Sequence, residues 1–201
     1  MDKNIFINLA KLFEKNGFSL YMIGGTSRDY LLERKVLDYD FVTDATPEEM
    51  NLFLESADFT FAKFGTIRIN YSNQKIDIVT MRVEGDYVDF RHPKTIHYVR
   101  DIKLDYVRRD FTINAIYIDK NFAVYDFADG LQDLKDGIIR FIGEPEKRVT
   151  EDPLRILRAE RFAKKLNFVI EEKTLAAINK HRSLLSKLSP DKVREEENKQ
   201  K

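Results

Sequence analysis

The sequence contains no cysteine, carries no net charge and has no long apolar run. The absence of cysteine excludes disulfides, thiolate metal ligands and cysteine nucleophiles. Lysine plus arginine equals aspartate plus glutamate, at 34 each, so nucleic-acid affinity would have to come from local clusters of charge. No run approaches the roughly 18 apolar residues of a membrane span, and the charged N-terminus is unlike a signal peptide. We therefore expect a cytoplasmic protein without membrane contact.

The pattern of apolar residues predicts a mixed α/β region followed by helices. Apolar residues between Ile5 and Phe13 recur at helical spacing. Residues 83–105 lack a clean period and are predicted to form a partly mobile loop. The order of elements predicts an α+β fold, in which a small mixed sheet with helices precedes a helical segment. Strands are expected at 19–25, 39–43, 65–71, 74–81 and 122–127, and further helices at 27–33 and from 46, 152, 171 and 189.

Candidate functional residues are most closely spaced between residues 24 and 40. Asp38 and Asp40 are two residues apart, and the period of a strand points both carboxylates to the same face. Two close like charges are tolerated best beside a cation, and Mg²⁺ usually takes one or two carboxylates plus substrate phosphate. Upstream, Gly24 and Gly25 allow backbone amides to approach an anion, while Arg28 offers a forked donor to a phosphate. A solvated turn is the alternative interpretation, because D-x-D triplets are common.

Five motifs occur in one order along the chain: GGTSRD at 24–29, DYDFVTDATPEE at 38–49, RRDFTINA at 108–115, DFADGLQDL at 126–134 and EDPLRILRAERF at 151–162. Together they resemble the class II CCA-adding tRNA nucleotidyltransferases and the bacterial poly(A) polymerases, which belong to the polymerase β superfamily. The resemblance implies a polymerase β-like catalytic head over residues 1–143 and a helical neck over 144–201. It also implies that a further body region starts at about residue 189.

The resemblance implies attack by an RNA 3′-hydroxyl on the α-phosphate of CTP or ATP, with release of pyrophosphate. Asp38 and Asp40 are then catalytic carboxylates and ligands of Mg²⁺ in a two-metal arrangement. Asp77 is the candidate third catalytic carboxylate, because Ile76 and Ile78 alternate against it and turn it away from the apolar face of its strand. The family usually has glutamate here, and an exposed strand acid is the alternative interpretation.

The same resemblance implies a set of nucleotide-binding residues. Arg109 and Asp110 lie in the motif where the family contacts the nucleotide, and Asn114 is expected to support the sugar or phosphate pocket. Outside this motif, adjacent arginines would indicate only a basic surface. The expected set in the head is Gly24, Gly25, Arg28, Arg109, Asp110 and Asn114.

Residues spaced by three form a row on the first helix of the neck: Asp152, Arg155, Arg158 and Arg161. Cytosine and adenine each present an amino donor beside a ring-nitrogen acceptor, whereas guanine and uracil present the reverse. A carboxylate only accepts and a guanidinium only donates, so Asp152 with Arg155 would fit C and A. An unpaired buried polar group costs about 1–3 kcal/mol, which is enough to reject G and U. The resemblance implies this same role, with Arg158 and Arg161 reaching the triphosphate, although Asp152 before Pro153 is also an ordinary helix N-cap.

The sequence leaves several functions open. The resemblance favours addition of C and A to the 3′ end of tRNA from CTP and ATP. Alternatives are a bacterial poly(A) polymerase and enzymes that add only CC or only A. An alternative of another class is a catalytically incomplete nucleotide-binding remnant, or a subunit whose RNA-binding body comes from another chain. Residues 84–98 fall where family members that add the terminal A carry a flexible loop.

Overall fold

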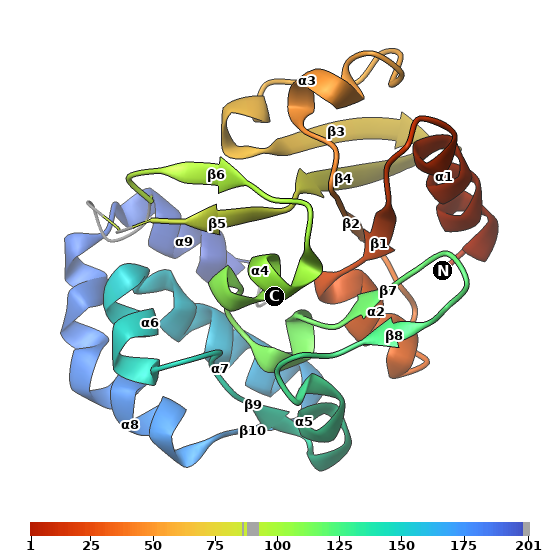
Figure 1. Cartoon of the computed structure of the whole chain (residues 1–201). Coiled ribbons are helices and arrows are strands. Elements are labelled where there is room, and N and C mark those ends of the chain that lie inside the picture. Colours follow the sequence, from red (N-terminus) through yellow and green to blue (C-terminus); the bar gives the residue numbers. More distant parts are fainter. Residues whose placement is uncertain (86, 88–92, 199–201) are drawn as a thin grey trace. The chain divides into compact units, whose positions relative to one another are not determined.

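A computed structural model describes residues 1–85, 87 and 93–198 of the chain (Figure 1). Its internal contacts define two compact units. The first unit comprises Met1–Val83, Ile96–Val107 and Asn114–Ala128, and the second comprises Glu84–Thr95, Arg108–Ile113 and Asp129–Lys201. The division into a head over 1–143 and a neck over 144–201 stays a prediction.

A six-stranded mixed sheet in the order β3-β4-β2-β1-β7-β8 forms the centre of the first unit. Strands β2 and β4 run parallel, and the other neighbours in the sheet are antiparallel. Strands β5 and β6 form a separate two-stranded sheet. The elements up to residue 125 are α1 (Lys3–Lys15), β1 (Leu20–Met22), α2 (Gly24–Leu31), β2 (Tyr39–Thr43), α3 (Pro47–Met50), η1 (Ala62–Phe64), β3 (Thr66–Tyr71), β4 (Gln74–Thr80), β5 (Arg82–Glu84), β6 (Ile96–Tyr98), α4 (Ile102–Asp105), η2 (Tyr106–Arg108), η3 (Thr112–Asn114), β7 (Tyr117–Ile118) and β8 (Val124–Tyr125).

One face of this sheet packs against the apolar side of α1. Helix α1 buries five residues, among them Phe6 and Phe13, in the same cluster as Phe41 of β2 and Ile78 of β4. Because strand side chains alternate, Asp40 lies on the opposite face from Phe41. The face opposite α1 therefore carries Asp40 together with a second apolar cluster, which includes Val42 and Tyr117.

The second unit has an aromatic centre and is otherwise mainly helical. The ring of Phe111 stacks on Phe141 at 5.2 Å between centroids and meets Phe162 edge-on at 5.5 Å. In the described part of the chain, none of the helices is long and apolar enough to cross a membrane. The elements are α5 (Gly130–Asp136), β9 (Ile138–Ile139), α6 (Pro145–Glu151), α7 (Leu154–Leu166), β10 (Val169–Ile170), α8 (Glu172–His181), η4 (Arg182–Lys187) and α9 (Pro190–Asn198).

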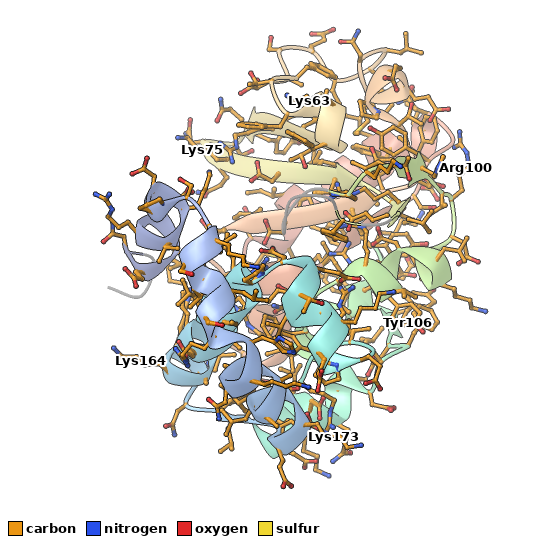
Figure 2. All side chains as sticks on the ribbon, turned by 90° about the vertical axis from the view of Figure 1, so that its left-hand side faces the viewer. Lys63, Lys75, Arg100, Tyr106, Lys164 and Lys173 are labelled. Atoms are coloured by element: carbon orange, nitrogen blue, oxygen red, sulfur yellow. The ribbon has the colours of Figure 1, made fainter. Side chains whose placement is uncertain are left out.

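Exposed basic side chains come from many elements of both units. Lys63, Lys75 and Arg100 lie at the surface of the first unit, and Lys164 and Lys173 at that of the second (Figure 2). The guanidinium of Arg100 is paired with an acid, since its Nη2 lies 2.7 Å from the carboxylate of Glu49. Such local pairing is what a chain with equal numbers of acids and bases is expected to show.

The α+β fold class is confirmed, and so are most predicted elements. The prediction for 83–105 was wrong in part, because β5, β6 and α4 lie there; residues 86 and 88–92 of the 84–98 loop lie outside the described residues. These strands have three residues each, too short to show a period. The predicted helix at 27–33 begins earlier, at Gly24, so both glycines belong to its first turn.

Candidate active site

The hydroxyl of Thr26 holds the two aspartates of the D-x-D motif at the start of β2. It donates to the carbonyl oxygen of Asp38 at 3.0 Å and accepts from the backbone N–H of Asp40 at 2.7 Å. The N–H of Ile23 donates to the carbonyl oxygen of Asp40 at 3.2 Å. These bonds fix the backbone of the motif against the first turn of α2 without using either carboxylate.

The glycine pair at the start of α2 lies against the carboxylate of Asp40. A Cβ at Gly24 would lie 3.4 Å from Oδ2 of Asp40, and one at Gly25 would lie 3.6 Å from the same oxygen. Gly24 also has a φ of +65°, which favours glycine. These glycines were predicted to let an anion approach, and in the structure the carboxylate of Asp40 lies beside them.

Three charged residues lie in one row across neighbouring strands. Asp40 of β2 is the register partner of Asp77 of β4, and Asp77 is in turn the partner of Arg68 of β3. Paired residues project to the same face of a sheet, so the two carboxylates are neighbours. Arg68 donates two hydrogen bonds to Asp77, 2.6 Å from Nε to Oδ1 and 2.8 Å from Nη2 to Oδ2. The predicted third carboxylate is thus beside the D-x-D motif, and its oxygens bond an arginine.

Arg28, which was predicted to offer its guanidinium to a phosphate, is buried, with 2% of its surface exposed. Its Nη2 lies 2.7 Å from Oδ1 of Asp29, and its Nη1 donates to Oδ1 of Asn114 at 2.9 Å. The structure therefore brings two predicted nucleotide-binding residues, Arg28 and Asn114, into direct contact. In this arrangement Arg28 links α2 to the end of the RRDFTINA motif.

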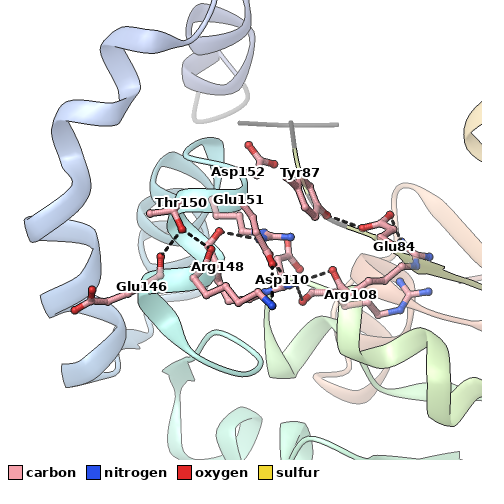
Figure 3. Close-up of polar contacts among 12 residues, drawn as sticks. Glu84, Tyr87, Arg108, Asp110, Glu146, Arg148, Thr150, Glu151 and Asp152 are labelled. Atoms are coloured by element: carbon pink, nitrogen blue, oxygen red, sulfur yellow. Dashed lines mark hydrogen bonds and ion pairs between the residues drawn. The ribbon is translucent and has the colours of Figure 1, made fainter. Parts of the chain in front are cut away.

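In the second unit, Arg155 contacts Glu151 and Tyr87, and both of these partners are labelled in Figure 3. Its Nη1 donates to Oε2 of Glu151 at 2.8 Å, and its guanidinium carbon lies 5.8 Å from the centre of the Tyr87 ring. Burial opposes the charge of Arg155, but the bond to Glu151 and the nearby acids raise its pKa. Burial and the carboxylate of Glu84 raise the pKa of Tyr87 to about 12, so the ring stays neutral.

Asp110 is buried and forms an ion pair with Arg158, whose side chain is partly exposed. Burial alone would raise the pKa of Asp110, yet the positive charges of Arg158 and Arg155 outweigh it and the pKa is lowered. Asp110 also accepts from the N–H of Phe111 at 2.8 Å. A carboxylate of the RRD segment is therefore held ionised by two arginines of the predicted neck row.

The remaining members of the row have structural partners. Oδ1 of Asp152 accepts from the N–H of Leu154 at 3.1 Å, so this side chain caps the start of α7. Helix α7 begins at Leu154, and Pro153 is its N-cap residue rather than its first helical residue. Nε of Arg161 donates to Oε1 of Glu196 at 2.7 Å.

Arg109, a predicted nucleotide-binding residue outside this row, accepts a hydrogen bond at its backbone carbonyl oxygen from Arg148, a residue that the motifs do not include.

Arg68 and Arg148 are two residues of the site that the sequence motifs do not include. Both could have been found from spacing. Arg68 lies opposite Asp77 in a hairpin closed by a two-residue turn. Arg148, Glu151 and Arg155 lie three and then four residues apart, at spacings that bring charged side chains together along a helix.

Residues 20–140 match the family described as "Poly A polymerase head domain". Residues 167–200 match a second family, described as "Probable RNA and SrmB- binding site of polymerase A". Since the first match covers more than half of the chain, the protein belongs to the poly A polymerase head domain family. The resemblance stated from the motifs is confirmed.

Named relatives and solved structures agree with this assignment. The CCA-adding enzyme of Lactobacillus helveticus is 45% identical over 189 residues, which are 94% of this chain and 47% of that protein. The CCA-adding enzyme of Staphylococcus epidermidis is 39% identical over 92% of this chain and 46% of its own length. The chain thus spans about half the length of these relatives.

Two solved structures share the fold over nearly the whole chain. The crystal structure of the Bacillus stearothermophilus CCA-adding enzyme in complex with CTP is 30% identical, with a TM-score of 0.91, and covers 100% of this chain and 49% of that one. A tRNA nucleotidyltransferase complexed with a primer tRNA and an incoming ATP analog is 31% identical, with a TM-score of 0.76, and covers 94% of this chain and 55% of that one. The head fold expected from the resemblance is confirmed.

Proposed function

We propose that this chain is the catalytic and base-reading part of a template-independent nucleotidyltransferase that adds C and A to the 3′ end of tRNA. The observation that carries the proposal is the side-by-side placement of Asp40 and Asp77 on one face of the sheet, with the D-x-D motif fixed by Thr26. A cluster of carboxylates on a rigid sheet is suited to phosphoryl transfer, which depends on positioning and charge neutralisation.

The reaction joins the 3′-hydroxyl oxygen of the RNA to the α-phosphorus of CTP or ATP. The bond from that phosphorus to the pyrophosphate oxygen breaks, and pyrophosphate leaves with the bonding electron pair. Asp77 is the carboxylate that would accept the hydroxyl proton, directly or through water. Asp38 and Asp40 keep the region beside it negatively charged, which a cation must balance.

The residues present fit Mg²⁺ as the cation. Asp40 on β2 and Asp38, in the bend just before β2, supply two carboxylates, and Mg²⁺ usually takes one or two carboxylates together with substrate phosphate. Within the described residues, no group of three histidine, cysteine or acidic side chains could hold an ion. When bound, Mg²⁺ would polarise the attacking hydroxyl and stabilise the leaving pyrophosphate.

Base selection is assigned to the start of the neck. Arg155 is held through Nη1, so Nη2 and Nε are the donors that can face a base edge. Asp152 would accept from the amino group of cytosine or adenine, while Arg155 would donate to the ring nitrogen. Arg109, Arg158 and Arg161 would bind the sugar and triphosphate, which requires Arg158 and Arg161 to exchange their present carboxylate partners for phosphate.

The relatives support tRNA as the RNA substrate, because both of the relatives named above are CCA-adding enzymes. One solved relative is a complex with CTP, and another contains primer tRNA and an ATP analog. We keep the cytoplasmic location expected from the sequence as part of the proposal. Another chain, or the remainder of a longer protein, would supply the RNA-binding body.

A poly(A) polymerase is the second candidate, and the description of the matching family favours it. The two are separated by incubating the chain with Mg²⁺, each labelled NTP in turn, and either tRNA lacking its CCA end or an unstructured oligoribonucleotide. Addition of C and then A that stops after CCA, on tRNA only, supports the proposal. Long A tails on either RNA identify a poly(A) polymerase, and single-nucleotide specialists stop after CC or add only A. Saturable CTP binding without incorporation identifies a nucleotide-binding remnant or a partner-dependent subunit.

A further inference from the structure

Arg148 is a buried arginine that none of the sequence motifs includes. It lies near the C-terminal end of α6, and only 7% of its surface is exposed. A buried charge is costly unless it is paired and hydrogen-bonded. The bonds that Arg148 makes are therefore the reason it can be buried, and they connect two segments of the second unit (Figure 3).

The first segment is the backbone of the RRD motif. Nη2 of Arg148 donates to the carbonyl oxygens of Arg108 at 2.7 Å and of Arg109 at 2.6 Å. Two consecutive carbonyl oxygens thus converge on one charged nitrogen. The next residue, Asp110, pairs with Arg158, so the whole RRD segment is tied to α6 and α7.

The second segment is the side chain of Arg155. Oε2 of Glu151 accepts from Nη1 of Arg148 at 2.7 Å and from Nη1 of Arg155 at 2.8 Å. Nη1 of Arg155 also donates to the carbonyl oxygen of Arg148 at 2.7 Å. Arg148 therefore fixes Arg155 twice, once through the shared carboxylate and once through its own backbone.

We propose that Arg148 is a positioning residue for base selection, which holds Arg155 in a fixed place relative to the backbone of residues 108–110. The inference rests on the proposed function, in which Arg155 reads the base. The guanidinium of Arg148 presents its donors in a rigid fork, so it bonds the carbonyls and Glu151 together. Without this guanidinium, the carbonyl oxygen of residue 148 would still accept from Arg155, but Glu151 would lose its link to the carbonyl oxygens of Arg108 and Arg109, and the donors of Arg155 would be held less firmly toward one base edge.

The test compares binding of CTP and UTP, which differ at the base edge that Arg155 would read. Dissociation constants are measured calorimetrically with Mg²⁺ on the 201-residue chain, with inorganic triphosphate as a ligand that has no base. Arg148→Met removes the donors and keeps an unbranched side chain. We expect the ratio of the UTP constant to the CTP constant to fall roughly tenfold, which corresponds to about 1.4 kcal/mol. The affinity for inorganic triphosphate is expected to stay within about twofold of the wild-type value.

Arg140→Met is the matched control. Arg140 also bridges two carboxylates in the second unit, those of Asp133 and Glu171, and its variant should leave the UTP-to-CTP ratio unchanged. Arg155→Met is the reference for lost base reading. The double variant Arg148→Met with Arg155→Met should show no lower ratio than Arg155→Met alone, because Arg148 acts through Arg155.

The outcomes separate this inference from the proposed function. If Arg155→Met lowers the ratio and Arg148→Met does not, the role of Arg148 is refuted and base reading by Arg155 stands. If Arg155→Met keeps the wild-type ratio, base reading by Arg155 is refuted, and the positioning role of Arg148 is refuted with it. Should Arg148→Met fail to fold, Arg148→Lys decides, since an ammonium keeps the charge but not the fork. A wild-type ratio in Arg148→Lys overturns the inference, and a lowered ratio in the folded variant supports it.

Discussion

Arg68 holds Asp77 by two hydrogen bonds, 2.6 Å from Nε to Oδ1 and 2.8 Å from Nη2 to Oδ2. The pair is partly exposed, at 45% for the arginine side chain and 33% for the aspartate. Exposed ion pairs contribute about 0–1 kcal/mol, so this pair matters little for stability. Its importance lies in its place, because Asp77 is the register neighbour of Asp40.

The first prediction concerns this pair. Arg68→Met should free both oxygens of Asp77 and so tighten binding of Mn²⁺, used as a spectroscopic substitute for Mg²⁺, in the presence of CTP. We expect the Mn²⁺ dissociation constant to fall severalfold, with a change in unfolding free energy of no more than about 1 kcal/mol. Electron paramagnetic resonance of free Mn²⁺ measures the first quantity, and urea unfolding measures the second.

The background variant Asp77→Asn supplies the control for Arg68→Met. In that background the removal of Arg68 should leave Mn²⁺ affinity unchanged, because the carboxylate that Arg68 occupies is gone. Weaker Mn²⁺ binding by the single variant Arg68→Met would show instead that Arg68 orients Asp77 for the cation.

Asp38→Ala and Asp40→Ala should each abolish nucleotide addition and leave the fold intact. The bonds from Thr26 and Ile23 to this segment use backbone atoms, so they survive truncation of either side chain. Incorporation of labelled CTP measures activity, and urea unfolding checks the fold. Glu55→Ala, at an exposed acid of the same unit, should keep full activity. Near-normal turnover of either aspartate variant with Mg²⁺ as the only metal would refute the metal assignment.

Local patterns predict much of the fold, and one contact of the candidate site follows from them as well. Ser72 and Asn73 form the turn between the strands predicted at 65–71 and 74–81, with a positive φ at both residues. This turn fixes the register of β3 and β4, so Tyr71 pairs with Gln74, and the opposition of Arg68 and Asp77 follows from it.

Contacts between distant segments could not be read in the same way. Asp40 and Asp77 lie on parallel strands joined by a long connection, and no turn sets their register. Arg158 was expected to face a triphosphate, but it pairs with Asp110, which a one-dimensional spacing does not place beside it. Helical spacing shows which residues share a face, whereas tertiary packing decides what that face contacts.

Arg155→Ala should relax base choice more than it weakens triphosphate binding. Loss of the donor leaves the base edge unpaired for CTP and ATP as well, so the discrimination against UTP and GTP should drop by about 1–3 kcal/mol. Single-turnover incorporation of each NTP measures the discrimination between bases, and competition by inorganic triphosphate measures the strength of triphosphate binding. Lys164→Ala, at an exposed position of α7, should behave like the wild type. Unchanged rejection of GTP and UTP would refute base reading by Arg155.

The lowered pKa of Asp110 predicts how the unfolding free energy of the chain depends on pH. Burial would raise its pKa, but Arg158 and Arg155 lower it below the ordinary value of 3.8. A carboxyl with a lower pKa in the folded chain stabilises that chain above the unfolded value, and this stabilisation is lost as pH falls through the folded value. Asp110→Asn should therefore lower the unfolding free energy at neutral pH, by about 1–3 kcal/mol, because Arg158 and the buried Arg155 lose the negative charge beside them.

The same substitution should flatten the acid side of the stability curve. Urea unfolding of both proteins between about pH 2 and pH 7 gives the difference in unfolding free energy, which should shrink as the pH drops below 3.8. Taking the difference removes the contributions of other acids with lowered pKa values, such as Glu171. Asp136→Asn, at an exposed acid of α5, should retain the wild-type acid slope. A constant difference across this pH range would show that the ion pair with Arg158 does not hold Asp110 ionised in solution.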